Sequence, residues 1–148
     1  MPILLIPVDG SAQSLRAVQA ALLLREQEGC DELLLLHVQL PLIGRTRGFF
    51  TDADLDALYR EDAERVFAPA RALLQAADLP FRELRAIGQP AEMIVRVARQ
   101  EKVAHIVMGT RGRGAATALL LGSVASKVLS AADVPVTLVN QEAPCTAC

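Results

Sequence analysis

The 148-residue sequence is poor in aromatic residues and in cysteine. It contains four Phe, one Tyr and no Trp, so we expect its core to consist mainly of Leu, Val, Ile and Ala. Its three cysteines, Cys30, Cys145 and Cys148, are too few and too unevenly spaced for a disulfide framework. A reducing compartment suits such a chain, and we expect it in the cytoplasm.

The sequence also lacks a long apolar run and a strong charge of either sign. No run approaches the roughly 20 apolar residues needed to span a bilayer, so we expect no membrane segment. The net charge of -2, with both signs interleaved, offers no sustained basic field for nucleic acid. Residues 1–8 have neither a basic leader nor a small-residue cleavage site, and they resemble a first strand.

Short apolar runs alternate with helical patterns along the chain. Leu15, Val18 and Leu22 recur at helical spacing, and Thr51 with Asp54 resembles a capping box at the start of a long helix. Leu58 should belong to the buried face of that helix, and the segment 39–50 before it should be a loop. The expected strands cover residues 3–8, 33–38, 81–87, 103–108 and 134–139, and the expected helices include ones beginning near Thr51, at Pro90 and at Gly122.

This alternation predicts an α/β fold with one doubly wound, five-stranded parallel sheet and helices on both faces. We expect a single domain over residues 1–140 and a mobile tail over residues 141–148. Ligands of such sheets bind beyond the carboxyl ends of the strands, where the strand order reverses. The loops after the first, second and fourth strands are therefore the segments in which to look for a site.

The segment after the fourth strand reads Gly109-x2-Gly112-x9-Gly122-Ser123. Glycines let the backbone approach a phosphate closely, and the free amides of a helix N-terminus favour an anion. A loop shaped by three glycines, the last of which caps a helix, explains the same spacing equally well. Neither the G-x-x-x-x-G-K-[ST] motif nor a G-x-G-x-x-G after the first strand is present, which excludes the P-loop and Rossmann dinucleotide interpretations.

The same motif, G-x2-G-x9-G-S, resembles that of the ATP-binding branch of the universal stress protein family. Other matching segments are Ile6-Pro7-Val8-Asp9-Gly10-Ser11, Leu36-His37-Val38, Gly88-Gln89-Pro90 and Ile106-Val107-Met108-Gly109, so the resemblance extends from residue 3 to about residue 139. It implies an ATP bound across the ends of the first and fourth strands. Adenine and ribose would contact Pro7, Val8, Asp9, Val38, Met108 and Gly109, and the phosphates would contact Gly112, Gly122, Ser123 and Val124.

Two of these residues carry further expectations. Asp9 could also face a magnesium ion bound to the phosphates, because a hard cation favours carboxylate oxygen, or it could cap the following helix. Ala125 lacks the hydroxyl that several ATP-binding relatives have two residues after the serine, which implies one phosphate contact fewer.

Other residues near the expected site have two interpretations each. His37 and His105, the latter at a position where relatives commonly have Asp, suit hydrogen-bonded structural roles better than catalysis. Arg111 and Arg113 could clamp phosphates or form a solvated surface. The loop bearing Arg45, Arg47, Phe49 and Phe50 could cover the ligand or form a second buried patch, and Cys145 and Cys148 suit an incidental tail better than redox coupling.

Three functions remain open from the sequence. The first is a stress-associated module whose ATP occupancy sets its conformation or its contact with a partner. The second is a slow ATP hydrolase using the same loop, or a nucleotidyl-transferring enzyme of this general fold. The third is a protein-interaction module that keeps the motif but holds no nucleotide. Because the apolar segment 134–139 is expected at a sheet edge, we also expect a homodimer formed through this strand.

Overall fold

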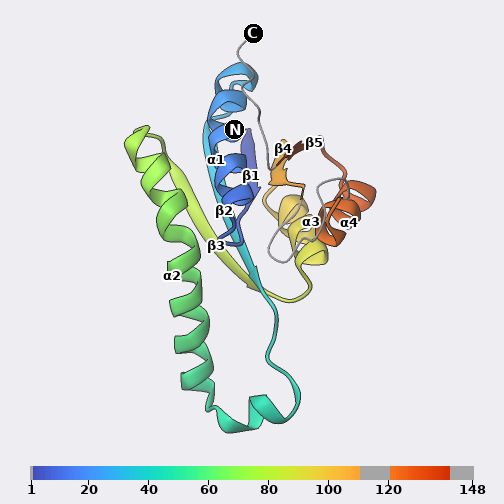
Figure 1. Cartoon of the computed structure of the whole chain (residues 1–148). Helices are drawn as coiled ribbons and strands as arrows, with labels where there is room; N and C mark the ends of the chain where they lie inside the picture. The colour runs from blue at the N-terminus through green and yellow to red at the C-terminus, as the bar shows by residue number, and fades with distance from the viewer. Residues whose placement is uncertain (1, 111–120, 141–148) are drawn as a thin grey trace.

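The computed structural model describes residues 2–110 and 121–140, and within them five parallel strands form one sheet (Figure 1). The strand order is β3-β2-β1-β4-β5, and every neighbouring pair is parallel. The predicted five-stranded, doubly wound α/β fold is therefore confirmed. The strands are β1 (Ile3–Pro7), β2 (Glu32–Gln39), β3 (Phe81–Ile87), β4 (His105–Gly109) and β5 (Val136–Val139).

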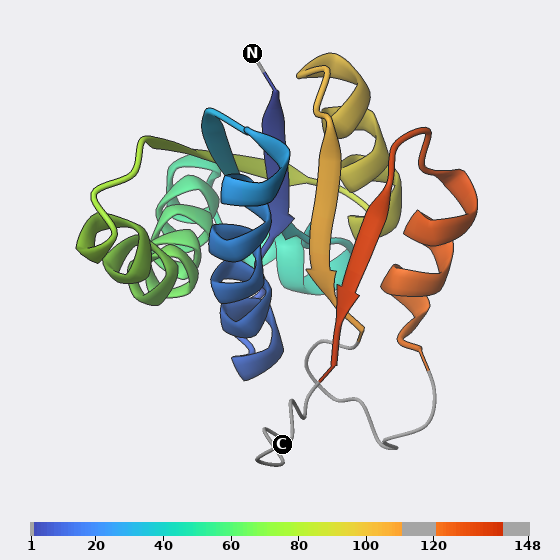
Figure 2. The ribbon, with the colours of Figure 1, turned by 90° about the horizontal axis from the view of Figure 1, so that it is seen from above.

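Helices cover both faces of this sheet (Figures 1 and 2). Alternate leucines of β2 face opposite ways, because successive side chains of a strand point to opposite faces. Leu33 and Leu35 pack in the layer of the first two helices, whereas Leu34 and Leu36 pack in the layer of the last two. The helices are α1 (Ala12–Glu28), α2 (Asp52–Ala76), α3 (Pro90–Gln100) and α4 (Ser123–Ala131).

The starts of the first two long helices have local causes. The hydroxyl of Ser11 accepts a hydrogen bond from the Ser14 N–H at 3.1 Å, so Ser11 is the N-cap of α1 and the interpretation of Asp9 as that cap is wrong. Thr51 and Asp54 form the predicted capping box of α2. None of the described helices is long and apolar enough to cross a membrane.

Several predicted boundaries differ from the observed ones. The fourth strand begins at His105 instead of residue 103, because the Val103 N–H donates to Ala98 O and so closes the end of α3. The fifth begins at Val136 rather than Val134, after Pro135. The second extends from Glu32 to Gln39, two residues longer than expected.

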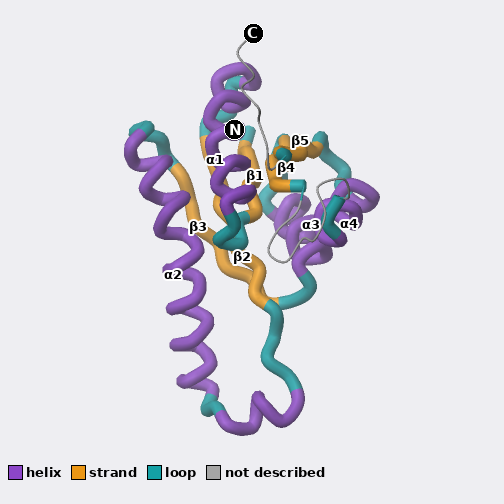
Figure 3. Tube along the Cα trace, viewed as in Figure 1, coloured by secondary structure: helices purple, strands orange, loops and turns teal. Residues whose placement is uncertain are grey.

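The segment 39–50, predicted to be a loop, contains a short 3₁₀ helix, η1 (Gly44–Phe49). Together with the first half of α2 it projects beyond the sheet (Figure 3). Leu58 in this half of α2 is 41% exposed, so its predicted burial is wrong. The neighbouring Tyr59 and Asp62 bond to side chains of β2, but Leu58 borders an open pocket instead of packing into the core. Pro69 lies inside α2, which continues through it to Ala76.

Candidate functional site

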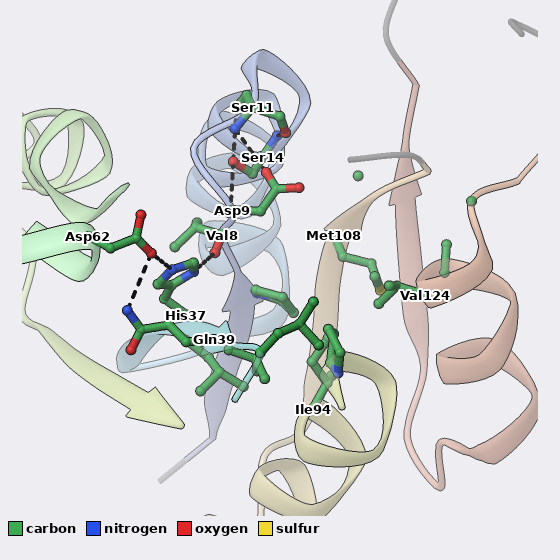
Figure 4. A pocket seen from close by; sticks show the side chains of 18 of the residues that line it. Val8, Asp9, Ser11, Ser14, His37, Gln39, Asp62, Ile94, Met108 and Val124 are labelled. Atoms are coloured by element: carbon green, nitrogen blue, oxygen red, sulfur yellow. Dashed lines mark hydrogen bonds and ion pairs between the residues drawn. The ribbon is translucent and has the colours of Figure 1, made fainter. Parts of the chain in front are cut away.

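A pocket of about 840 Å³ lies at the carboxyl ends of β1, β2 and β4. The order β3-β2-β1-β4-β5 places β1 beside β4, and the chain leaves these two strands toward opposite faces of the sheet. Such a reversal opens a crevice between the loops that follow the two strands. Side chains from both helical layers line this pocket (Figure 4).

The pocket gathers nine of the ten residues expected at a site from the sequence. The tenth, Gly112, lies outside the described residues, as do Arg111, Arg113, Cys145 and Cys148. The nine that line the pocket are Pro7, Val8, Asp9, Val38, Met108, Gly109, Gly122, Ser123 and Val124.

Backbone hydrogen bonds bring the two ends of the glycine motif together. Thr110, directly after β4, donates its N–H to Val139 O at 3.0 Å, and its own carbonyl accepts from the Gly122 N–H at 2.7 Å. Gly109 and Ser123 therefore lie in the same pocket although 13 residues separate them in the sequence numbering. Gly122 is the N-cap of α4 and has no side chain to cap the helix.

The uncapped start of α4 differs from the start of α1. The Ser11 hydroxyl satisfies one first-turn amide of α1, but no side chain of the described residues does so in α4. The first amides of a helix have no partners within the helix, and the dipole makes this end electropositive. The pocket therefore has, beside Ser123 and Val124, a group of backbone donors suited to an anion.

Asp9 provides a carboxylate on the β1 side of the pocket. Its Oδ1 accepts a hydrogen bond from the Ser11 N–H at 2.8 Å, and Oδ2 has no hydrogen-bond partner among the described residues. The side chain is half-buried and points toward the pocket (Figure 4). One carboxylate oxygen is thus free to bind a cation or a hydroxyl.

A polar wall on the α2 side completes the pocket, and sequence reasoning did not predict it as part of a site. His37 Nδ1 contacts Val8 O at 2.9 Å and Nε2 contacts Asp62 Oδ2 at 3.0 Å. Both partners are acceptors, so the two contacts are satisfied together when both ring nitrogens carry hydrogen. The amide of Gln39 donates to Tyr59 O at 2.6 Å and to Asp62 Oδ2 at 3.3 Å.

Asp62 is the centre of this wall and is held as a carboxylate. Burial would raise the pKa of Asp62, but hydrogen bonds from His37, Arg65 and Gln39 outweigh it and lower the pKa to about 2. No sequence pattern identified Asp62, because its partners on β2 lie more than 20 residues away in the chain. The position of His37 at the end of β2 was the available clue.

His105 lies elsewhere, on β4, which pairs with β1 on one side and with β5 on the other. Its Nδ1 contacts Glu28 Oε1 at 2.8 Å at the end of α1, and its Nε2 contacts Thr137 Oγ1 at 2.7 Å on β5. The side chain is buried and does not line the pocket. The structure thus agrees with a hydrogen-bonded structural role for this histidine.

Comparison with known proteins shows which family this chain belongs to. The profile of the universal stress protein family matches residues 1–140. The chain belongs to the universal stress protein family. A universal stress protein of Thermus aquaticus is 39% identical to it over 141 residues, which cover 93% of this chain and 97% of the relative.

Solved structures of universal stress proteins share the fold. The structure of MJ0577, a universal stress protein of Methanocaldococcus jannaschii, superposes with a TM-score of 0.79 at 26% identity and covers 95% of this chain and 96% of its own. A universal stress protein structure from Archaeoglobus fulgidus gives a TM-score of 0.71 at 26% identity, with coverage of 95% and 98%. The family thus accounts for nearly the whole chain.

Proposed function

We propose that this chain is a cytoplasmic universal stress protein that binds ATP in the pocket between β1 and β4 and acts as a nucleotide-dependent regulatory module. One observation carries the proposal. The pocket gathers the described residues that the motif resemblance assigns to adenine, ribose and phosphates. Its volume of about 840 Å³ lies within the usual range of small-molecule sites.

The chemistry around the pocket suits a nucleotide. The uncapped amides of α4 and the Ser123 hydroxyl would hold phosphate oxygens, and the half-buried Val38 with Met108 would contact the base and sugar. The free Oδ2 of Asp9 would bind a magnesium ion carried by the phosphates. Magnesium would neutralise phosphate charge there.

Universal stress protein structures with bound nucleotides support this assignment. One is described in complex with cAMP, one from Archaeoglobus fulgidus with dAMP, and one from Arabidopsis thaliana with AMP. Each shares the fold with this chain, with TM-scores of 0.63, 0.67 and 0.70 respectively. The adenine ring common to these ligands favours an adenine nucleotide here.

The polar wall favours binding over hydrolysis. A general base must be free to accept a proton near neutral pH. Asp62, with its pKa lowered to about 2, is a poor base, and both nitrogens of His37 are engaged by Val8 and Asp62. Burial, followed by the nearby Glu28 and Asp31, raises the pKa of the Cys30 thiol, so this free cysteine is a weak nucleophile.

The decisive experiment identifies what the purified protein carries. The protein is denatured and the released small molecules are separated by chromatography. Bound ATP supports the proposal, bound ADP alone favours the hydrolase, and protein that carries nothing and gains no thermal stability from added ATP contradicts it. At a ligand concentration about a hundred times Kd, binding should add about 2.7 kcal/mol of stability, or roughly 5 to 10 °C in Tm.

A homodimer formed through β5 is part of the proposal. β5 is an edge strand and all four of its residues, Val136–Val139, are half-buried by their own chain. Pro135 O and Val139 O accept hydrogen bonds from the β4 side, so the backbone groups of Val136 and Leu138 face away from the sheet. An apolar edge with outward-facing backbone groups favours pairing with a second copy.

A further inference from the structure

A second groove, of about 750 Å³, runs between α3 and α4 on the outer side of the helical layer. The two helices lie side by side in Figure 2 and pack against each other. None of the residues that line this groove belongs to the candidate nucleotide site. The α3–α4 groove is lined by Ala91, Glu92, Val95, Arg96, Arg99, Gln100, Ser126, Lys127, Ser130 and Ala131.

The charge of the α3–α4 groove is opposite in sign to the net charge of the whole chain. The chain has a net charge of -2, but three of the four charged side chains in the groove are basic. Arg99 forms an ion pair with Asp133 at 2.6 Å. Arg96 and Lys127 are exposed, one on each helix, and neither has an ion-pair or hydrogen-bond partner in the described part of the chain. Two unmatched cations therefore flank the groove.

The floor of the groove allows a close approach and offers hydrogen bonds. Its apolar lining residues are Ala91, Val95 and Ala131, which are small, and the first two are buried. The Ser126 hydroxyl and the Gln100 amide make no hydrogen bond within the described residues. These groups suit the N–H and C=O groups of a peptide backbone.

The length of the groove sets the size of its occupant. The 11 residues of α3 extend about 16 Å at a rise of about 1.5 Å per residue. An extended peptide rises about 3.3 Å per residue, so about five residues cover the same length. Two carboxylate side chains within such a segment could reach Arg96 and Lys127 together.

We propose that the α3–α4 groove binds a short acidic segment of a partner protein, with its carboxylates on Arg96 and Lys127 and small side chains on the floor. Glu92 in the first turn of α3 would repel a uniformly anionic chain, which favours a peptide of mixed character over a nucleic-acid backbone. Three acids on the projecting half of α2 already pair with arginines of this chain, so they are not available to a groove on a second copy. These pairs are Asp52 with Arg47, Asp56 with Arg60, and Asp62 with Arg65.

The test measures binding of fluorescent peptides about ten residues long, in which Asp or Glu alternates with Ala, Ser and Val. Fluorescence anisotropy at low and high salt gives the affinity of the full chain, and peptides with Asn and Gln in place of the acids are the ligand control. We expect the acidic set to bind, with an affinity that falls as salt rises. The Arg96→Glu/Lys127→Glu variant should bind at least about tenfold more weakly.

The matched control is Arg45→Glu/Arg85→Glu, which changes the net charge by the same amount at two exposed arginines outside the groove. This variant should bind the peptides as the unmodified chain does, and circular dichroism should show that both variants fold. An equal loss of peptide affinity in the two variants would show that the effect depends on net charge alone, and it would overturn the proposal. It is also overturned if no acidic peptide binds, if a single-stranded oligonucleotide binds more tightly, or if the chain associates with itself through this groove.

Discussion

At the scale of single residues, Ser123 is the side chain whose role in nucleotide binding can be isolated most cleanly. It is exposed at the first turn of α4 and lines the pocket. Ser123→Ala should weaken ATP binding on the order of tenfold, because one hydroxyl donor to a charged phosphate is lost while the helix amides remain. Isothermal titration calorimetry measures the change.

Ser126→Ala is the control for this change. Ser126 lies one turn further along α4, is exposed and does not line the pocket between β1 and β4. Its substitution should leave the Kd for ATP unchanged. Equal affinities of the two variants would mean that Ser123 does not contact the phosphates.

Asp62 should make the stability of the fold vary with pH in the acid range. Its folded-state pKa of about 2 lies below the ordinary value of 3.8, so its ionised form stabilises the folded state above pH 3.8. That contribution is lost as the pH falls from 3.8 toward 2. Because the side chain is 36% exposed, we expect an effect on the order of 1 kcal/mol after allowing for solvent screening.

Urea unfolding of the unmodified protein and Asp62→Asn at several pH values checks this expectation. The difference in unfolding free energy between the two proteins should be largest near neutral pH and shrink below pH 3.8. Asp56→Asn, which removes an exposed pair with Arg60, should show a smaller difference. A pH-independent difference for Asp62→Asn would contradict the hydrogen-bonded carboxylate described above.

At the scale of secondary-structure elements, His105 connects three that are distant in sequence. It joins the end of α1, through Glu28, to Thr137 on the edge strand β5. His105→Leu should lower the unfolding free energy by about 1 to 2 kcal/mol, because it leaves the half-buried Thr137 hydroxyl and the more exposed Glu28 carboxylate without their partner.

A double-mutant cycle measures how much of this loss comes from the contact with β5. His105→Leu, Thr137→Val and the double variant are compared by urea denaturation. A coupling energy of about 1 kcal/mol is expected for a direct hydrogen bond. Strict additivity would show that His105 stabilises β4 without holding β5.

The start of α2 illustrates an effect confined to one element. Thr51→Ala removes the side-chain oxygen of the capping box and should cost about 1 kcal/mol of stability. Thr51→Ser keeps the hydroxyl and should retain most of the stability that the cap contributes. If thermal unfolding shows equal losses for both variants, the cap does not contribute through this oxygen.

At the scale of the whole molecule, assembly through β5 can be tested with one backbone group. The N–H of Val136 faces away from β4, so Val136→Pro should remove a donor from the free edge while keeping the ladder with β4. We expect a dimer for the unmodified protein and a folded monomer for this variant in light scattering at micromolar concentration. Val136→Thr retains the N–H and should remain dimeric, and a dimeric proline variant would exclude pairing through this edge.

The sequence by itself determined the fold class and most of the residues of the pocket at the carboxyl ends of the strands. Alternating apolar runs and helical periods require parallel strands with crossover helices, and parallel strands bring the ends of β1, β2 and β4 to one edge. Residues at the ends of those strands or just beyond them, such as Gly109 and Asp9, could therefore be assigned from their place in the chain. These features depend on local periodicity, which the sequence displays directly.

Only the tertiary structure decided which helix surfaces line the pocket at the carboxyl ends of the strands and which helices pack against each other. Asp62 and Tyr59 face the pocket because α2 packs against β2, and Leu58 is exposed because it borders the same open pocket. Arg96 and Lys127 likewise share a groove because α3 and α4 lie on the same face. Contacts between residues so far apart depend on how whole elements pack, and no local pattern in the chain encodes them.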